Sequence, residues 1–96
     1  MAIHGMIDLE TLDTSVNAVI LTVGAIKFDP LSNSEPYAEM YHRLDVDEQT
    51  ALDRTVDQGT IEWWGTQDEA IWQEALGDED RVSIDDFIRD LQRWVV

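Results

Sequence analysis

The chain has 96 residues, 44% of them hydrophobic, and carries six basic against twenty-one acidic residues, for a formal net charge of −15. That length allows one domain with a modest core, and the apolar content excludes a disordered acidic tail. The charge excludes binding of nucleic acid through a basic surface alone, because such a surface pairs Lys and Arg with phosphates. We therefore expect residues 1–96 to form a single domain that meets DNA or RNA only with help from bound cations or another protein segment.

The chain contains no cysteine, so disulfides and cysteine-ligated zinc are excluded. Its longest apolar stretch, residues 18–26, is far shorter than the roughly 20 residues that a membrane helix needs. Residues 1–5 lack the basic region and the apolar core of a signal peptide. We expect a cytoplasmic protein with no membrane partner.

Three strands are predicted before any clear helix. Residues 3–9 form a short apolar run, residues 17–28 form a longer run rich in Val and Ile, and residues 37–44 alternate apolar or aromatic with polar side chains. The polar segments 11–16 and 29–36 separate the runs, and the second segment is dense in turn formers. This pattern predicts an antiparallel meander whose central strand is residues 17–28.

Helices are expected to follow the sheet. Residues 45–59 are polar and predict a connection with at most one short helical turn, after which Thr60 is expected to cap a helix that ends at Gly65. Thr66 and Glu69 fit a capping box that opens a second helix.

The last helix is predicted to begin after Ser83. Its apolar residues recur at helical spacing, and they are Ile84, Phe87, Ile88, Leu91, Trp94 and Val95. The fold class that follows is α+β, a three-stranded antiparallel sheet with helices packed on it.

Asp8 and Glu10 are candidate catalytic carboxylates and metal ligands at the end of the first predicted strand. Because they are two residues apart, their side chains project from the same face of a strand. Two carboxylates so close raise each other's pKa unless a divalent cation neutralises them, and oxygen ligands suit Mg²⁺ or Mn²⁺. The spacing alone also fits a solvated strand end, because Asp-x-Glu is frequent by chance.

Two segments around these carboxylates resemble a known family. Residues 6–12 and 17–30 resemble the first motif and the second strand of the DEDD 3'-5' exonucleases, and they are most similar to the phage and prophage group that includes exonuclease A and the Rv2179c-like exoribonucleases. Residues 59–64 are similar to a Thr-Ile-x-Trp-Trp segment of that group. The matches span residues 3–64, and the final predicted helix fits the family's first long helix.

The resemblance implies a ribonuclease H-like fold in which four acidic residues hold two divalent metals, Mg²⁺ or Mn²⁺, and cleave the 3' end of single-stranded DNA or RNA. Asp8 and Glu10 match the first two metal ligands, and Thr11 and Leu12 match positions that line the pocket of the terminal nucleotide. The family's other two ligands would lie beyond Val96. The resemblance therefore implies an incomplete fold, the N-terminal half of an exonuclease domain, which would need a C-terminal half or a homodimer as its partner. A phage-encoded protein would act in the host cytoplasm.

The tryptophans divide between packing and binding. Trp63 is a candidate for stacking on a nucleotide base, although packing against the sheet fits it equally well. Trp64, Trp72 and Trp94 lie on the apolar stripes of their predicted helices, which predicts core positions for all three.

The two histidines are expected to be structural. His42 and Asp47 have the His-x-x-x-x-Asp spacing of the family's general base and last ligand. Five is an odd number, so on a strand the two side chains would point to opposite faces, and the order along the chain differs from the family's. We therefore expect His42 to be a surface residue of a strand and His4 to be structural.

Two other hypotheses remain open. A catalytically inactive phage protein with this charge could mimic the phosphate surface of DNA and inhibit a nucleic-acid-binding enzyme, in which case substitution of Asp8 and Glu10 would change nothing. A prophage remnant without function is the third reading. In each case an apolar patch left uncovered would favour a homodimer.

Overall fold

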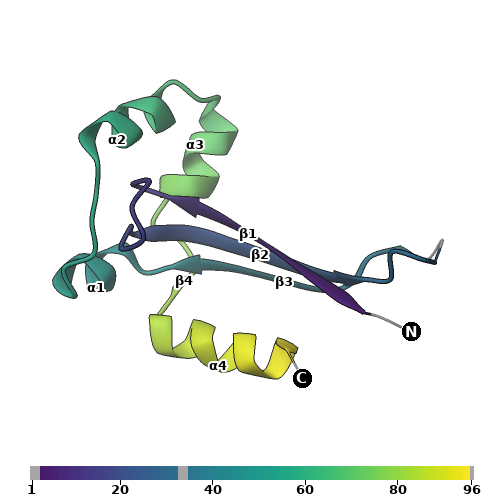
Figure 1. The fold of residues 1–96 in the computed structure, drawn as a ribbon. Helices are drawn as coiled ribbons and strands as arrows, with labels where there is room; N and C mark the ends of the chain where they lie inside the picture. The colour runs from purple at the N-terminus through teal and green to yellow at the C-terminus, as the bar shows by residue number, and fades with distance from the viewer. Residues whose placement is uncertain (1–2, 33–34, 96) are drawn as a thin grey trace.

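The protein is described by a computed structural model that covers residues 3–32 and 35–95. Figure 1 shows a sheet with α3 on one side and α4 on the other, which confirms the predicted α+β class. The elements in chain order are β1 (His4–Thr11), β2 (Ile20–Phe28), β3 (Tyr37–Leu44), α1 (Val46–Ala51), α2 (Gln58–Gly65), α3 (Glu69–Leu76), β4 (Arg81–Val82) and α4 (Ile84–Val95). Among these residues no helix is long and apolar enough to cross a membrane.

The sheet has four strands in the order β1-β2-β3-β4, so the prediction of three antiparallel strands was wrong. β1, β2 and β3 form the predicted antiparallel meander, whereas β4 pairs with β3 in parallel. The chain returns to β3 only after α1, α2 and α3, and a crossover of that length is what a parallel pair requires. With two residues, β4 is too short to produce any periodicity in the sequence.

The two strands at the start of the chain differ from their predicted limits. β1 continues two residues beyond Leu9, so both candidate carboxylates lie inside the strand. β2 begins at Ile20 instead of residue 17, because the register shifts after Glu10 and the preceding segment turns aside, with Ala18 bridged to Thr55.

Helix α1 is longer than the predicted single turn, because the side chains of an acidic residue and a glutamine stabilise it. The Asp45 carboxylate accepts a hydrogen bond from the Glu48 N–H at 2.9 Å, which caps the helix. Gln49 is fully buried, accepts from the Ile20 N–H and donates to the Ile20 carbonyl, both at 2.8 Å. A glutamine thus fixes the first residue of β2 as a neighbouring strand would.

Two predicted helix caps were wrong. Asp57, not Thr60, caps α2, because its carboxylate accepts from the Thr60 N–H at 2.9 Å. Thr66 closes α2 instead of opening α3, and its hydroxyl donates to the Trp63 carbonyl at 2.6 Å. The Ser83 cap of α4 is as predicted, with the Asp86 N–H donating to its hydroxyl oxygen at 3.1 Å.

The predicted tryptophan positions are confirmed in part. Trp64 is 4% exposed and belongs to the core cluster with Leu12, Val19, Leu21 and Ala75. Trp72 is 37% exposed, contrary to prediction, because α3 turns Ala75 and part of Leu76 toward the core cluster, and Trp72 is not among the residues that pack there.

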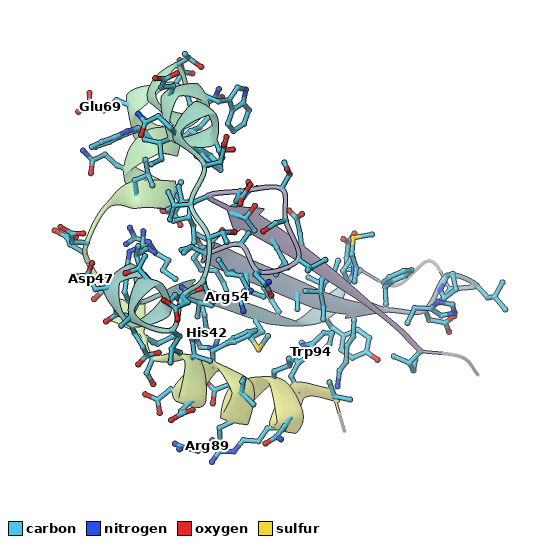
Figure 2. The ribbon with its side chains drawn as sticks, turned by 60° about the vertical axis from the view of Figure 1, so that its left-hand side comes forward. His42, Asp47, Arg54, Glu69, Arg89 and Trp94 are labelled. Atoms are coloured by element: carbon cyan, nitrogen blue, oxygen red, sulfur yellow. The ribbon has the colours of Figure 1, made fainter. Side chains whose placement is uncertain are left out.

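Trp94 and His42 lie on the side of the sheet that α4 covers, as Figure 2 shows. Trp94 is half-buried, and its indole N–H donates to the Ala38 carbonyl at 2.6 Å. The His42 Nε2 lies 3.1 Å from an Asp90 carboxylate oxygen of α4, and its ring packs edge-on against Phe87. His42 is therefore a strand residue as predicted, but α4 half-buries it, and its acidic partner is Asp90 and not Asp47.

Arginine side chains tie α3 to the sheet. Arg81 donates to the carbonyls of Leu21 at 3.0 Å, Leu44 at 2.9 Å and Ala75 at 2.6 Å. Arg43 donates to the Gly77 carbonyl at 2.7 Å and the Gln73 carbonyl at 3.1 Å. These cations lie at the C-terminal end of α3, where they also offset the partial negative charge of the helix dipole. The position of α3 over the sheet is thereby fixed.

Candidate active site

Asp8 and Glu10 lie on the same face of β1, as the sequence spacing predicts. Asp8 is opposite Gly24 of β2, and Glu10 is opposite Thr22. Partial burial, and to a lesser extent the neighbouring Asp8 carboxylate, raise the pKa of Glu10 above its ordinary value. The pair therefore carries an electrostatic cost that a bound cation would relieve.

Gly24 leaves open space beside Asp8. Because Gly24 has no side chain, it lines a hollow of about 210 Å³ together with Asp8 and Tyr41. A Cβ atom at Gly24 would meet only the Tyr41 ring, at 4.0 Å. The Asp8 carboxylate is exposed and accessible to a ligand on this face.

A second hollow, which we call the α2 hollow, lies at the end of β1 and has a volume of about 380 Å³. Its lining residues are Leu9, Glu10, Thr11, Thr14, Asp57, Gly59, Thr60, Trp63 and Trp64. Glu10, Thr11 and Trp63, three of the predicted site residues, therefore meet in one place. Their role toward a nucleotide stays a prediction.

The two tryptophans of the α2 hollow have different tasks. The Trp64 indole N–H donates to the Thr11 carbonyl at 3.0 Å, which joins α2 to the end of β1. Trp63 is 54% exposed and packs edge-on against Trp64, with ring centroids 4.8 Å apart. Trp64 is thus the packing residue, and Trp63 presents an aromatic surface to the solvent.

Leu12, the remaining predicted nucleotide-binding residue, is a core residue. Its side chain is 5% exposed and belongs to the core cluster, and its backbone N–H and carbonyl pair with Val19 and Asp57 at 2.9 and 2.8 Å. Leu12 is therefore not among the lining residues of the α2 hollow, and nearly all of its side chain is covered.

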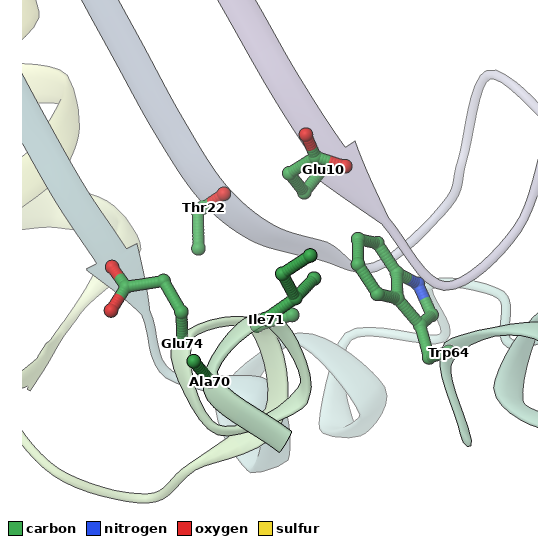
Figure 3. A pocket seen from close by; sticks show the side chains of 7 residues that line it. Glu10, Thr22, Trp64, Ala70, Ile71 and Glu74 are labelled. Atoms are coloured by element: carbon green, nitrogen blue, oxygen red, sulfur yellow. The ribbon is translucent and has the colours of Figure 1, made fainter. Parts of the chain in front are cut away.

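A third hollow, the α3 hollow, lies between the sheet and α3 (Figure 3). It has a volume of about 380 Å³, and its lining residues are Glu10, Thr22, Trp64, Ala70, Ile71, Glu74 and Ala75. No local pattern in the sequence indicates this hollow. Glu74 stands on a different element from Glu10 and 64 positions away in the chain (74 − 10), so only the fold brings the two carboxylates to one hollow.

Tyr41 holds Glu74 at the rim of the α3 hollow. The Tyr41 hydroxyl donates to a Glu74 carboxylate oxygen, and burial together with this bond raises the pKa of Tyr41 to about 12. The phenol therefore remains a proton donor at neutral pH. The sequence gives one indication of this contact. The alternation of residues 37–44 places Tyr41 and Arg43 on the same face of a strand.

The pair formed by Asp8 and Glu10 fits an open Mg²⁺ or Mn²⁺ site by its chemistry. Over residues 3–32 and 35–95 no group of three or more His, Cys, Asp or Glu side chains is arranged to hold a metal. Mg²⁺ keeps several waters and commonly takes only one or two carboxylates, with phosphate oxygens of the substrate as further ligands. Two carboxylates on an exposed strand match that requirement, and Asp8 and Glu10 are the residues that would hold the ion.

Comparison with known proteins identifies the family of the chain. The family model described as "3'-5' exoribonuclease Rv2179c-like domain" matches residues 3–96, which include every residue of the three hollows. Comparison with curated proteins and with solved structures finds no significant match. Because the family model matches nearly the whole chain, the protein belongs to the Rv2179c-like family of 3'-5' exoribonuclease domains.

Proposed function

We propose that this domain acts in the metal-dependent removal of nucleotides from the 3' end of single-stranded RNA, with Asp8 and Glu10 as metal ligands. The observation that carries the proposal is the position of these carboxylates on one face of β1, beside the aromatic α2 hollow. The meander of β1, β2 and β3, followed by a long helix against the sheet, supports a ribonuclease H-like fold. The family description supports RNA as the substrate.

Asp8 and Glu10 would hold Mg²⁺ or Mn²⁺ at the edge of the sheet. The chemistry that a divalent ion supplies there is activation of a water and stabilisation of negative charge on the phosphodiester oxygens. The chain itself would fix the positions of the two carboxylates, because β2 pairs with β1 in regular register from His4 to Glu10. Further ligands would come from water, the substrate or another protein segment.

Thr11 and Trp63 would position the terminal nucleotide. Trp63 offers an exposed ring, and stacking of a base on an aromatic side chain contributes about 1–3 kcal/mol. The Thr11 hydroxyl donates to the Asp13 carbonyl at 2.7 Å, so its oxygen is oriented as an acceptor for a ligand hydroxyl. Trp64 would keep both groups in place, through its hydrogen bond to the Thr11 carbonyl and its edge-on contact with Trp63.

Because the net charge is −15, divalent cations would also be needed to bring RNA to the protein. RNA phosphates are repelled by an acidic surface, and in the absence of a basic stripe only bound cations or a cationic partner can reverse that repulsion. We therefore expect substrate affinity, and not only the rate of cleavage, to depend on the divalent ion.

The test is shortening of end-labelled single-stranded RNA and DNA across a titration of Mg²⁺ and Mn²⁺. Wild-type protein is compared with the Asp8→Asn, Glu10→Gln double variant. The matched control is the Asp47→Asn, Glu69→Gln double variant, which changes the charge equally on two exposed helical residues outside the hollows.

We expect metal-dependent shortening from the 3' end with wild type and with the control, and none with the Asp8, Glu10 variant. Activity that survives loss of both carboxylates would refute the proposal. Inactivity of all three proteins would also refute it for this chain and would favour an inactive acidic binding protein.

A further inference from the structure

We propose that the α3 hollow binds a second base of the RNA strand, and that Glu74 makes it prefer bases that carry an amino group. The proposal rests on the exonuclease function proposed above, since it takes the strand to be the ligand. Glu10 and Trp64 line both the α3 hollow and the α2 hollow, so the two hollows adjoin at the candidate metal site. A strand whose reacting phosphate lies at Glu10 therefore has a hollow on either side.

The walls of the α3 hollow suit the flat faces of a base. Trp64, Ala70, Ile71 and Ala75 give it a largely apolar lining, and Thr22 is buried at its floor. Ile71 is 48% exposed, so about half of its side chain remains available for a ligand to cover. The volume of about 380 Å³ lies near the lower end of the range of ligand pockets, roughly 300–1,000 Å³, and suits one base better than a longer segment.

The two carboxylates at the hollow determine which chemical group can enter. Glu10 lines the hollow from β1 and Glu74 lines its edge from α3 (Figure 3). A phosphate would meet repulsion from both, whereas a base is neutral and carries N–H donors on its edge. The strand would therefore place a base, and not its backbone, in the α3 hollow.

Glu74 would select among the bases. An ionised carboxylate only accepts hydrogen bonds, so it favours the exocyclic amino groups of adenine, cytosine and guanine. Uracil has no exocyclic amino group: its only donor on that edge is N3–H, which lies between two carbonyl oxygens that repel a carboxylate. Tyr41 holds the Glu74 carboxylate through its hydroxyl, and Arg43 fixes the same turn of α3 by donating to the Glu74 carbonyl at 3.0 Å.

Occupation of both hollows requires bases that are neither paired nor stacked on each other. A duplex end cannot supply two such bases without unpairing. The arrangement therefore assigns a single-stranded substrate and a contact with at least two of its nucleotides.

The experiment is an NMR titration of the protein with adenosine, cytidine and uridine, in the absence of divalent metal. Nucleosides lack phosphate, so their binding depends on neither the metal nor cleavage. The signals followed are the Ile71 methyl groups and the Trp64 indole N–H. Glu74→Gln is the test variant, because the introduced amide still accepts from Tyr41 but can also donate to a uracil carbonyl. Glu69→Gln, on the same helix and outside the hollow, is its control.

We expect adenosine and cytidine to shift these signals with a Kd about three to ten times lower than that of uridine, the ratio expected for one hydrogen bond in a partly solvated site. Glu74→Gln should bring the ratio close to one, and Glu69→Gln should leave it unchanged. Unshifted Ile71 and Trp64 signals would overturn the proposal, as would a ratio that survives in Glu74→Gln. Stronger shifts with spermidine than with any nucleoside would also overturn it, by showing a site for amines.

The failure of this proposal can be distinguished from failure of the proposed function. Base selection without metal-dependent cleavage would refute the exonuclease function and retain the base site. Cleavage that requires Asp8 and Glu10 but shows no base selection would do the reverse.

Discussion

β1 and β2 are neighbours in one sheet, yet they differ in their position in the sheet and in the burial of their side chains. β2 lies between two strands and buries Leu21 and Val23 completely. β1 lies at the edge of the described sheet, and its apolar residues Ile7 and Leu9 remain 49% and 46% exposed. The candidate carboxylates are on the exposed strand. Stability thus comes mainly from β2, whereas the proposed chemistry belongs to β1, a strand that contributes little burial of its own.

The largest expected effect is on stability and separates the two strands directly. Leu21→Ala in β2 should lower the free energy of unfolding by about 2–5 kcal/mol, because it removes a fully buried side chain from the core cluster. Leu9→Ala in β1 should cost less than about 1 kcal/mol, since nearly half of that side chain is already exposed. Urea unfolding of both variants measures the difference, and equal losses would contradict the division between the strands.

The next effect is a loss of cleavage activity without a loss of stability. Asp8→Asn should lower metal-dependent cleavage by at least about a hundredfold, the loss typical of removing one electrostatic contact to a transition state. Its unfolding curve should be unchanged or shifted to higher urea, because Asp8 is exposed and its negative charge repels that of Glu10. A loss of activity that is matched by a loss of stability would mean that Asp8 is a structural residue.

A smaller effect is expected at the junction between β1 and α2. Trp64→Phe retains most of the packing but removes the indole donor to the Thr11 carbonyl, which should cost about 1 kcal/mol. Thermal unfolding measures the stability, and the cleavage assay should show a raised KM if Trp64 also positions Thr11 and Trp63. Trp63→Phe, at an exposed ring, is the control for stability and should have no measurable effect on unfolding.

The smallest effect is a pH dependence at Glu10. Its pKa is raised in the folded protein, so the ionised form is less favourable there than in the unfolded chain. The resulting cost is absent well below the ordinary Glu pKa of 4.5, grows as the pH rises past that value, and is fully present at neutral pH. Without metal, Glu10→Gln should therefore melt at a higher temperature than wild type at pH 7, with a smaller difference at pH 4. A difference independent of pH would contradict this assignment.

Much of the fold could be predicted because its signals are local. Residues 37–44 alternate as a half-buried strand does, and the last helix has a continuous apolar stripe, so both elements have the predicted limits. β4 could not be predicted, since two residues have no period and its pairing depends on a crossover of three helices. Trp72 was placed wrongly because the helical pattern identifies an apolar face but not whether another element covers it.

Some residues of the candidate site could likewise be predicted from local sequence, and others could not. Asp8 and Glu10 could be paired from a spacing of two, since strand geometry alone decides that they share a face. Thr22 and Glu74 could not be assigned, because one lies within an apolar run, the other lies on a helix, and only the tertiary packing of α3 over β2 brings them together. Leu12 follows its candidate neighbours in sequence but not in space, because the chain turns into the core after Thr11.

Site-specific Mn²⁺ binding is the most direct test of the claim that the exposed strand carries the chemistry. Mn²⁺ broadens the NMR signals of nearby nuclei, so a substoichiometric titration of the protein maps where the ion binds. We expect selective loss of the backbone amide signals of Asp8, Glu10 and Gly24, and retention of these signals in the Asp8→Asn, Glu10→Gln variant. Broadening concentrated at the acidic loop of residues 78–80, or broadening at β1 that persists in the variant, would contradict the assignment of Asp8 and Glu10 as metal ligands.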